Sequence, residues 1–331
     1  MPVPLVDPFQ RTVRDLRISI TDRCNFRCTY CMPQEGMQWL PRDELLTYEE
    51  LTRVARVCVE RFGFESIRIT GGEPTVRAHL PVLIERLAAL GVDLAMTTNG
   101  ATLTHQAADL AQAGLRRVNV SCDSLRPERF AAITGRDALP QVLAGIDAAV
   151  AAGLRPVKVN CVLVRGVNDD EIADFAGYAR SKGVELRFIE WMPLDASGRW
   201  TASQVVPASE VIAAIDSVWP LVAPDGSRAR ASDPAETYDY ADGAGRIGVI
   251  ASVTRPFCGS CDRIRLTAEG QLRNCLFAVR ETDLRPILRS GGSDDELAAA
   301  IEAEVGRKWA GHSIGQVTFT RPARTMSQIG G

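Results

Sequence analysis

Three cysteines in one short stretch give the clearest chemical signal in the chain. Residues 21–33 read TDRCNFRCTYCMP and place Cys24, Cys28 and Cys31 in the spacing C-x3-C-x2-C. Cysteine thiolates are ligands of zinc and of iron–sulfur clusters. A structural zinc site takes four ligands, and the sequence offers no fourth cysteine or histidine nearby. The trio therefore favours a four-iron cluster with one open iron, while zinc or incidental clustering stays as the alternative.

A second group of three cysteines lies near the other end of the chain. Cys258, Cys261 and Cys275 follow the spacing C-x2-C-x13-C, which by itself is also compatible with a zinc ribbon that lacks one ligand. Two arginines follow in the stretch CGSCDRIRL, and strand periodicity places Arg263 and Arg265 on the same face. Because two such arginines repel each other, we expect an anion between them, unless both are exposed to solvent.

The composition indicates a globular protein without a global charge excess. The chain has 331 residues, 46% of them hydrophobic, a net charge of −3 and no apolar run of 18 residues. These values argue against a membrane protein and against a general nucleic-acid binder. The N-terminal stretch has no signal- or transit-peptide features, so we expect a cytoplasmic protein whose thiols are reduced. The other three cysteines are expected to be small buried hydrophobes: Cys58, Cys122 and Cys161.

Lysine is rare in this chain, with three lysines among 38 basic residues. One of them, Lys158, lies in the apolar stretch VKVNCVLV, where a charge is unexpected. Since the chain usually has arginine at cationic positions, Lys158 indicates a site that needs a compact point charge. Three histidines leave little room for a multi-histidine metal site or histidine-based acid–base chemistry.

From residue 16 to about residue 220, short β-type runs alternate with amphipathic helical stretches. We expect strands at 16–20, 66–70, 94–98, 117–122, 157–164 and 185–191. We expect helices at 48–62, 76–90, 104–113, 139–152 and 170–182. Several of these helices precede a glycine, which is a common helix end. The order predicts a mainly parallel α/β sheet, most simply an incomplete (β/α)6 TIM-like barrel, with an open doubly wound sheet as the alternative.

A turn-rich segment at 223–245 marks the expected boundary between two parts of the chain. Residues 1–222 form the predicted partial barrel, and residues 223–331 form a smaller α+β domain that covers its mouth. In the second part we expect strands at 246–253 and 263–277, a hairpin turn at Glu269–Gly270, and helices at 281–289 and 293–306. The final stretch TMSQIGG shows no core pattern.

The first cysteine trio resembles the signature of the radical S-adenosylmethionine (SAM) superfamily. C-x3-C-x2-C follows the first predicted strand, an aromatic residue precedes the last cysteine, and RITGGEP follows further along. This resemblance implies a [4Fe–4S] cluster on Cys24, Cys28 and Cys31 whose open iron is chelated by SAM. The positions that it implies as SAM contacts are Tyr30, Gly72, Ser121 and Met192.

The combined pattern resembles the GTP 3′,8-cyclases, the radical SAM family that opens molybdenum cofactor biosynthesis. The likeness runs along most of the chain and includes RITGGEP, TTNG, RRVNVSCDS, RFIEWMP and FCGSCDRIRLTAEGQLRNCLF. It implies a second [4Fe–4S] cluster on Cys258, Cys261 and Cys275, with an open iron that binds the substrate. The implied GTP contacts are Arg17, Arg68, Thr97, Lys158, Arg263 and Arg265. The terminal Gly330 and Gly331 resemble a tail that reaches into the active-site cavity.

The resemblance also implies a reaction and its partners. A 5′-deoxyadenosyl radical would remove the ribose 3′ hydrogen of GTP, and C3′ would then bond to C8 of guanine. The product would be (8S)-3′,8-cyclo-7,8-dihydroguanosine 5′-triphosphate, made with a reductant and passed to the next enzyme of the pathway. The oligomeric state stays open, with a homodimer among the candidates. The rival functions are a peptide-modifying radical SAM maturase and a non-catalytic metal-binding scaffold.

Overall fold

Six parallel strands form the centre of the molecule. The computed structural model describes residues 2–33, 37–195, 198–223, 232–317 and 319–330. The central strands lie side by side in chain order: β3 (Asp15–Ser19), β4 (Ser66–Thr70), β5 (Asp93–Thr98), β6 (Arg117–Ser121), β7 (Val157–Leu163) and β8 (Glu185–Glu190). A doubly wound sheet would reverse its strand order, so this uninterrupted order confirms the incomplete (β/α)6 barrel.

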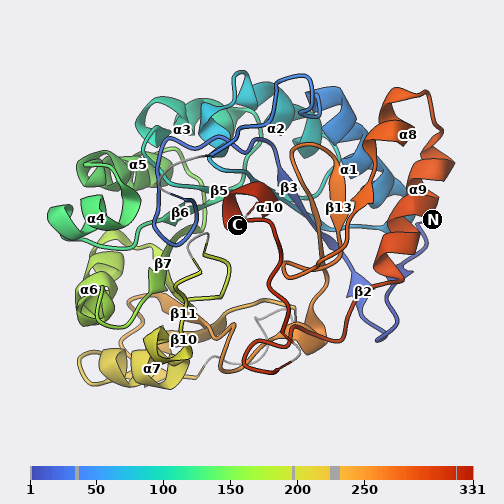
Figure 1. The fold of residues 1–331 in the computed structure, drawn as a ribbon. Coiled ribbons are helices and arrows are strands. Elements are labelled where there is room, and N and C mark those ends of the chain that lie inside the picture. The colour runs from blue at the N-terminus through green and yellow to red at the C-terminus, as the bar shows by residue number, and fades with distance from the viewer. Residues whose placement is uncertain (1, 34–36, 196–197, 224–231, 318, 331) are drawn as a thin grey trace.

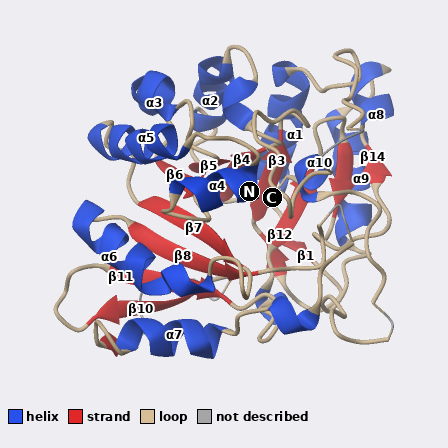
Figure 2. Ribbon diagram, turned by 60° about the vertical axis from the view of Figure 1, so that its left-hand side comes forward, coloured by secondary structure: helices blue, strands red, loops and turns tan. Residues whose placement is uncertain are grey.

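Helices cover the outer face of this curved sheet (Figures 1 and 2). They are α1 (Tyr48–Phe62), α2 (Leu80–Ala88), α3 (Leu103–Gln112), α4 (Pro127–Thr134), α5 (Leu139–Ala151), α6 (Ile172–Lys182) and α7 (Ala208–Asp216). Helix α1 shows how the sequence sets the bounds: Thr47 and Glu50 form a capping box, and Gly63 ends the helix with φ +71°. The other face of the sheet is left for the site.

Several helical details differ from the expectation. The segment expected as a helix at 281–289 contains strand β14 (Thr282–Asp283), and its helix, α8, covers only Arg285–Arg289. The helix expected at 76–90 is divided into a 3₁₀ turn, η1 (Pro74–Val76), and α2, because His79 between them adopts φ +60°. Helices α4 and α7 were not expected. Each has only eight or nine residues, which is too short for a strong helical period.

The C-terminal part of the chain extends the same sheet at both edges. Strand β11 (Arg246–Ile250) pairs in parallel with β8, and β12 (Arg263–Leu266) pairs in parallel with β3. The outer strands are β9 (Leu221–Val222) and β10 (Glu236–Tyr240) on one side, and β13 (Gln271–Arg273) and β14 (Thr282–Asp283) on the other. The hairpin expected at Glu269–Gly270 joins β12 to β13. Further elements are the small β1–β2 sheet (Leu5–Val6, Thr12–Val13), α8 (Arg285–Arg289) and α9 (Asp294–Val305).

The core lies between the sheet and its helices. Leu16, Ile18, Ile67 and Ile69 on β3 and β4 are inaccessible to solvent, and they belong to one continuous apolar cluster. Cys58, Cys122 and Cys161 are buried free thiols, as predicted. No helix among the described residues is long and apolar enough to span a membrane.

The last described residues lie inside the curve of the sheet, where Figure 1 shows α10 (Met326–Ile329) near the centre of the molecule. This short helix carries Ser327 and Ile329, both only 1% exposed. The stretch TMSQIGG shows no core pattern in the sequence, yet Ile329 is buried, because one isoleucine is too few to form a periodic pattern. Gly330 follows with φ +81°, and a Cβ there would collide with the Thr70 hydroxyl. Gly331 lies outside the described residues.

Candidate functional site

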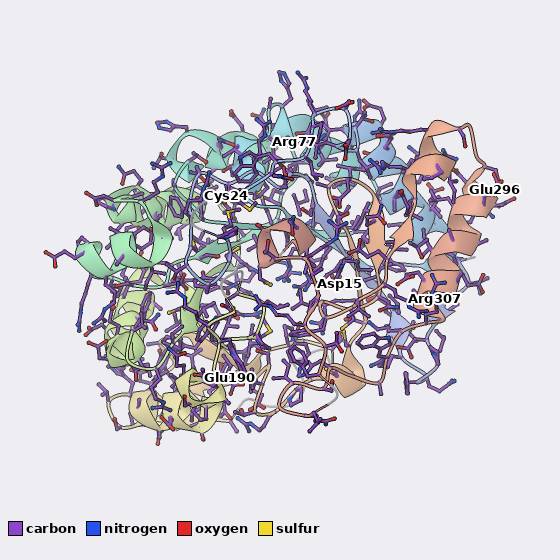
Figure 3. All side chains as sticks on the ribbon, viewed as in Figure 1. Asp15, Cys24, Arg77, Glu190, Glu296 and Arg307 are labelled. Atoms are coloured by element: carbon purple, nitrogen blue, oxygen red, sulfur yellow. The ribbon has the colours of Figure 1, made fainter. Side chains whose placement is uncertain are left out.

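The first cysteine trio lies in the loop that follows β3 (Figure 3 labels Cys24 and, at the start of the strand, Asp15). The Phe26 N–H donates to Cys24 Sγ at 3.3 Å, and the backbone N–H of Ser327 in α10 points to the Cys31 sulfur. Burial raises the pKa of Cys24 to about 11 and that of Cys31 to about 12. These thiols therefore keep their protons until a metal replaces them, since coordination deprotonates a thiol.

The GGE turn after β4 is packed directly against this loop. The Gly72 N–H donates to the Thr21 carbonyl at 2.6 Å, and the Glu73 N–H donates to the Arg23 carbonyl at 2.8 Å. A Cβ on Gly72 would collide with the carbonyl oxygens of Asp22 and Arg23, so only glycine fits there.

Glu73, which completes the GGE motif, is 1% exposed and acts as a local anchor. Its carboxylate accepts hydrogen bonds from Thr75, from the Thr98 hydroxyl at 2.6 Å and from the Asn99 N–H at 2.6 Å. The side-chain amide of Asn99 in turn faces Cys24 Sγ at 3.9 Å. The carboxylate thus fixes the end of β5 beside the first cysteine trio.

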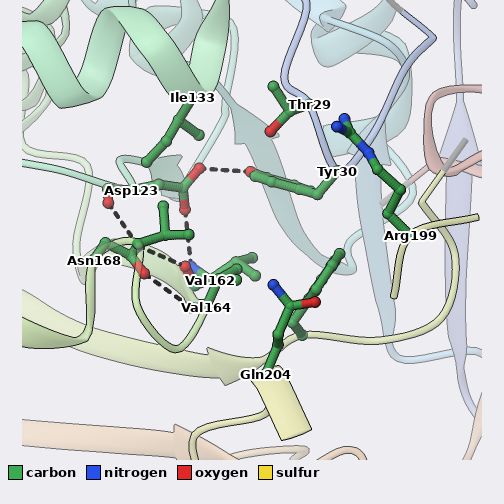
Figure 4. Close-up of a pocket in the computed structure, with 11 residues that line it drawn as sticks. Thr29, Tyr30, Asp123, Ile133, Val162, Val164, Asn168, Arg199 and Gln204 are labelled. Carbon is green, nitrogen blue, oxygen red and sulfur yellow. Dashed lines mark hydrogen bonds between the residues drawn. The ribbon is translucent and has the colours of Figure 1, made fainter. Parts of the chain in front are cut away.

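Tyr30 is held by a carboxylate that the sequence analysis did not single out (Figure 4). Its hydroxyl donates to Asp123 Oδ2 at 2.6 Å, and Asp123 Oδ1 accepts the Val162 N–H at 2.8 Å. Burial raises the pKa of Asp123 to about 6, an effect that these donors only partly oppose. Tyr30 and Asp123 line a pocket at the ends of β6, β7 and β8, together with Val162, Trp191 and others.

The other two candidate SAM contacts also follow carboxyl ends of strands. Ser121 is the last residue of β6, and Met192 lies two residues beyond β8. Both therefore lie at the carboxyl-terminal edge of the parallel sheet, which is the edge where α/β barrels bind their ligands.

The second cysteine trio lies on the other side of the interior. Cys258 opens the 3₁₀ turn η4 (Cys258–Ser260), Cys261 precedes β12, and Cys275 follows β13. Burial acts to raise the pKa of Cys261, but the charges of Lys308 and Arg263 outweigh it and lower this pKa to about 7.

The sulfurs of this trio also accept backbone donors. The Phe277 N–H donates to Cys275 Sγ at 3.4 Å, and the backbone N–H of His312 faces Cys258. Gly311 is packed against the same residue, since a Cβ there would come within 2.7 Å of the Cys258 Cβ. The segment that includes Gly311 and His312 therefore forms one wall of this trio.

One internal cavity joins the second trio to the barrel interior. About 1080 Å³ of space, its open mouth included, lies between its walls, and the barrel strands β3–β8 each contribute a lining residue. Half of the predicted site residues line it: Arg17, Arg68, Thr97, Met192, Cys258, Cys261, Arg263, Arg265 and Cys275. Sequence reasoning missed several others: Asn119, Asn160, Arg187, His312 and Met326.

Three arginines of this cavity, Arg17, Arg68 and Arg265, have no carboxylate within ion-pair distance among the described residues, whereas Arg187 pairs with Glu185. The Nε atoms of Arg17 and Arg68 are buried without a hydrogen-bond partner in the described structure. Burial and the neighbouring Arg17 lower the pKa of Arg68 to about 9, and burial with Arg17 and Arg263 lowers the pKa of Arg265 well below its usual value. Such a cluster is costly unless an anion occupies it, and guanidinium groups suit phosphate oxygens.

Lys158 is the predicted cation that departs from this arrangement. It is not among the residues that line the cavity within the described parts of the chain, and its Nζ lies 3.3 Å from Glu185 Oε1. Glu185 also accepts from Arg187 Nε at 2.6 Å, and Arg187 does line the cavity. Lys158 therefore lies behind Arg187, with Glu185 between the two cations.

The tail enters the same space. Arg265 Nη1 donates to the Gly330 carbonyl, and Met326 lines the cavity. Upstream, Arg324 bridges Glu269, at 2.5 Å, and Glu281, at 2.6 Å. These contacts attach the last residues to the β12–β13 hairpin and direct Gly330 inward.

The two trios fit clusters better than single metal ions. In the part of the chain that the structure describes, no three His, Cys, Asp or Glu side chains converge to hold one ion. Each cysteine of a [4Fe–4S] cubane binds a different iron, so the three sulfurs need not meet at one point. The N–H donors to Cys24, Cys31, Cys261 and Cys275 are of the kind that surrounds cluster thiolates.

Comparison with known proteins agrees with this arrangement. Residues 18–179 match the radical SAM superfamily, and residues 184–314 match the family described as Molybdenum Cofactor Synthesis C. The GTP 3′,8-cyclase of Streptomyces coelicolor is 50% identical over 329 residues, which cover 99% of this chain and 96% of that protein. The GTP 3′,8-cyclase of Mycolicibacterium smegmatis is 50% identical over 334 residues, covering 99% and 92% respectively.

A solved structure shares the fold at low sequence identity. Streptococcus suis SuiB bound to S-adenosylmethionine superposes with a TM-score of 0.61 at 12% identity, covering 91% of this chain and 68% of SuiB. That likeness concerns the fold alone, whereas the full-length relatives at 50% identity define the family. The chain belongs to the GTP 3′,8-cyclase family of the radical SAM superfamily.

Proposed function

We propose that the chain converts GTP to (8S)-3′,8-cyclo-7,8-dihydroguanosine 5′-triphosphate, a lyase-class reaction. One observation carries the proposal: a cavity with buried, unpartnered arginine donors is also lined by the second cysteine trio. A triphosphate would balance the arginines, and the rest of the nucleotide would then extend toward Cys258, Cys261 and Cys275. The names of the full-length relatives support the same substrate.

Two [4Fe–4S] clusters and SAM are the proposed cofactors. Cys24, Cys28 and Cys31 would hold the first cluster, with SAM at Tyr30, Gly72, Ser121 and Met192. When bound and reduced, this cluster supplies the electron that cleaves SAM to methionine and a 5′-deoxyadenosyl radical. The second trio would hold a cluster whose open position receives the substrate. We also propose that residues 1–222 serve SAM and the first cluster, while residues 223–331 supply the second cluster and the tail.

The protein's own part in this chemistry is binding, orientation and exclusion of water. Arg17, Arg68, Arg263 and Arg265 would hold the triphosphate, with Thr97 beside them on β5. Lys158 is paired with Glu185, and it would contact a phosphate only if this ion pair broke. We therefore propose that Lys158 acts indirectly, through the Glu185 carboxylate that also binds Arg187.

The tail would complete the cavity from its open side. Gly330 lies against Ser19 and Thr70 at the carboxyl ends of β3 and β4, and its carbonyl accepts from Arg265. A side chain does not fit there, which supports a role for the terminal glycines near the reacting atoms. We further propose a reductant and an enzyme that consumes the cyclised nucleotide as partners.

An anaerobic single-turnover assay with SAM, a reductant and GTP tests the proposal. We expect 5′-deoxyadenosine and the cyclised triphosphate in equal amounts, from protein with about eight irons and eight sulfides per chain. Zinc without sulfide would refute the cluster chemistry and favour a metal-binding scaffold. Deoxyadenosine formed while GTP stays intact would refute the substrate and favour a peptide-modifying maturase.

A further inference from the structure

A buried lysine lies directly behind the second cysteine trio. Lys308 follows α9 and is 4% exposed, although lysine is normally a surface residue. Its Nζ lies 2.8 Å from the Arg263 carbonyl oxygen, 2.6 Å from the Asn274 carbonyl oxygen and 3.8 Å from Cys261 Sγ. An ammonium group has three N–H donors, so these three acceptors use all of them.

The charge of Lys308 has no carboxylate partner among the ion pairs of the described residues. The other two lysines each face one: Lys158 lies near Glu185, and Lys182 lies 2.7 Å from Asp147. Burying a cation beside neutral carbonyls alone is costly. One of its three acceptors, the Cys261 sulfur, becomes a negatively charged thiolate when it binds metal.

The two backbone carbonyls that accept from Lys308 belong to two different segments of the chain. Arg263 lies two residues after Cys261, and Asn274 immediately precedes Cys275. The ammonium therefore ties the start of β12 to the end of β13 at the points where two ligands of the trio are attached.

On the basis of the two-cluster site proposed above, we propose that Lys308 is a positioning residue for the second cluster. Its ammonium fixes the spacing of Cys261 and Cys275 through two peptide carbonyls and donates an N–H···S hydrogen bond to the ligand sulfur of Cys261. A cation and an N–H donor at a ligand sulfur stabilise the more negative, reduced form of a cluster. Lys308 therefore raises the reduction potential of the second cluster as well as helping to retain it.

The geometry also explains the choice of lysine in a chain dominated by arginine. The three acceptors belong to different segments, and an ammonium directs its three N–H bonds apart in space. A guanidinium group presents its donors in one plane and is larger, so it cannot serve the same three acceptors without displacing one strand. Lys308→Arg should therefore fail to replace lysine although it keeps the charge.

The test compares Lys308→Met with Lys182→Met, a matched change at an exposed lysine. Each variant, and the wild type, is reconstituted anaerobically; iron and sulfide are counted, and the reduced clusters are titrated by electron paramagnetic resonance with and without SAM. We expect about eight irons in the wild type and in Lys182→Met, and a loss of about half of them in Lys308→Met. The signal that responds to SAM should stay in Lys308→Met, because the first trio is untouched.

Lys308→Gln keeps N–H donors without the charge and covers the case in which Lys308→Met does not fold. It should retain part of the second cluster, with a lower reduction potential than in the wild type. Wild-type iron content and an unchanged potential in both Lys308 variants would overturn the inference. A wild type with only about four irons would overturn the two-cluster proposal itself, and that result is visible before any variant is compared.

Discussion

Replacing Arg68 with methionine should stabilise the nucleotide-free protein while abolishing its response to GTP. Arg68 faces the cavity with a buried, unpartnered Nε, and burial together with the charge of Arg17 lowers its pKa from 12.5 to about 9. That change corresponds to roughly 5 kcal/mol of unfavourable environment for the charged form. Water in the cavity screens part of this cost, and exchanging poorly paired buried charges for apolar groups typically gains about 1–4 kcal/mol. For a chain of this length, we expect the Tm of Arg68→Met to rise by roughly 2–6 °C.

The sign with pH follows from the same lowered pKa. Below about pH 9 both the folded and the unfolded chain carry the Arg68 proton, so the full cost is present. Above that pH the folded protein loses this proton while the unfolded chain keeps it. The free energy of unfolding of the wild type therefore rises relative to that of Arg68→Met. The advantage of Arg68→Met should therefore be constant from pH 7 to pH 8.5 and should shrink above pH 9.

Anaerobic differential scanning calorimetry with and without GTP measures both effects. Arg14→Met is the control, because Arg14 is half-exposed and its pairing with Glu65 at 3.3 Å is worth at most about 1 kcal/mol. GTP should raise the Tm of the wild type and of Arg14→Met, and leave that of Arg68→Met unchanged. A fall in Tm for Arg68→Met, or a normal GTP response, would refute the view that Arg68 is an unbalanced cation awaiting a phosphate.

Three further substitutions test other parts of the site. Arg263→Ala and Arg265→Ala should each weaken GTP binding roughly 30-fold or more, as expected for the loss of a buried charge pair. SAM cleavage in the absence of GTP should persist. Equal loss of GTP binding and SAM cleavage would show that these two arginines are structural. Gly330→Ala should abolish cyclisation, because a Cβ at Gly330 collides with the Thr70 hydroxyl, and deletion of Gly330–Gly331 should abolish it by removing the tail. Product chromatography measures the activity, and calorimetry should show little change in Tm. Full activity would show that the tail is dispensable. Glu73→Gln should lower the free energy of unfolding by about 2–3 kcal/mol in urea titrations, because an amide cannot accept every hydrogen bond that the carboxylate accepts; an unchanged midpoint would contradict the anchoring role.

The barrel was predictable because its signals are local and repeated. Each expected strand of the barrel lies within a few residues of an observed one, and glycines such as Gly63 and Gly183 end helices α1 and α6. The attachment of β11 to β8 and of β12 to β3 was not predictable, because pairing partners far apart in sequence leave no local pattern.

The site also contains features that local sequence patterns predict and features that depend on contacts between distant residues. The spacing within each cysteine trio is local, so the cysteines could be identified from the sequence. Asp123 could not be linked to Tyr30, since their hydrogen bond joins residues 93 positions apart. The rarity of lysine in the sequence indicated that Lys158 is unusual, but the same reasoning was not applied to Lys308. The fold distinguishes the two buried lysines, because Lys158 faces a carboxylate and Lys308 faces a cysteine.

The C-terminal tail contacts both the first cysteine trio and the cavity of the second trio, and no single sequence motif predicts this. The Ser327 N–H points to Cys31 of the first trio, Met326 lines the cavity that reaches the second trio, and the Gly330 carbonyl accepts from Arg265. The stretch Met326–Gly330 thus contacts Cys31, a candidate cluster ligand, and Arg265, a candidate nucleotide contact. The tail is therefore packed against both the first cysteine trio and the arginines of the cavity.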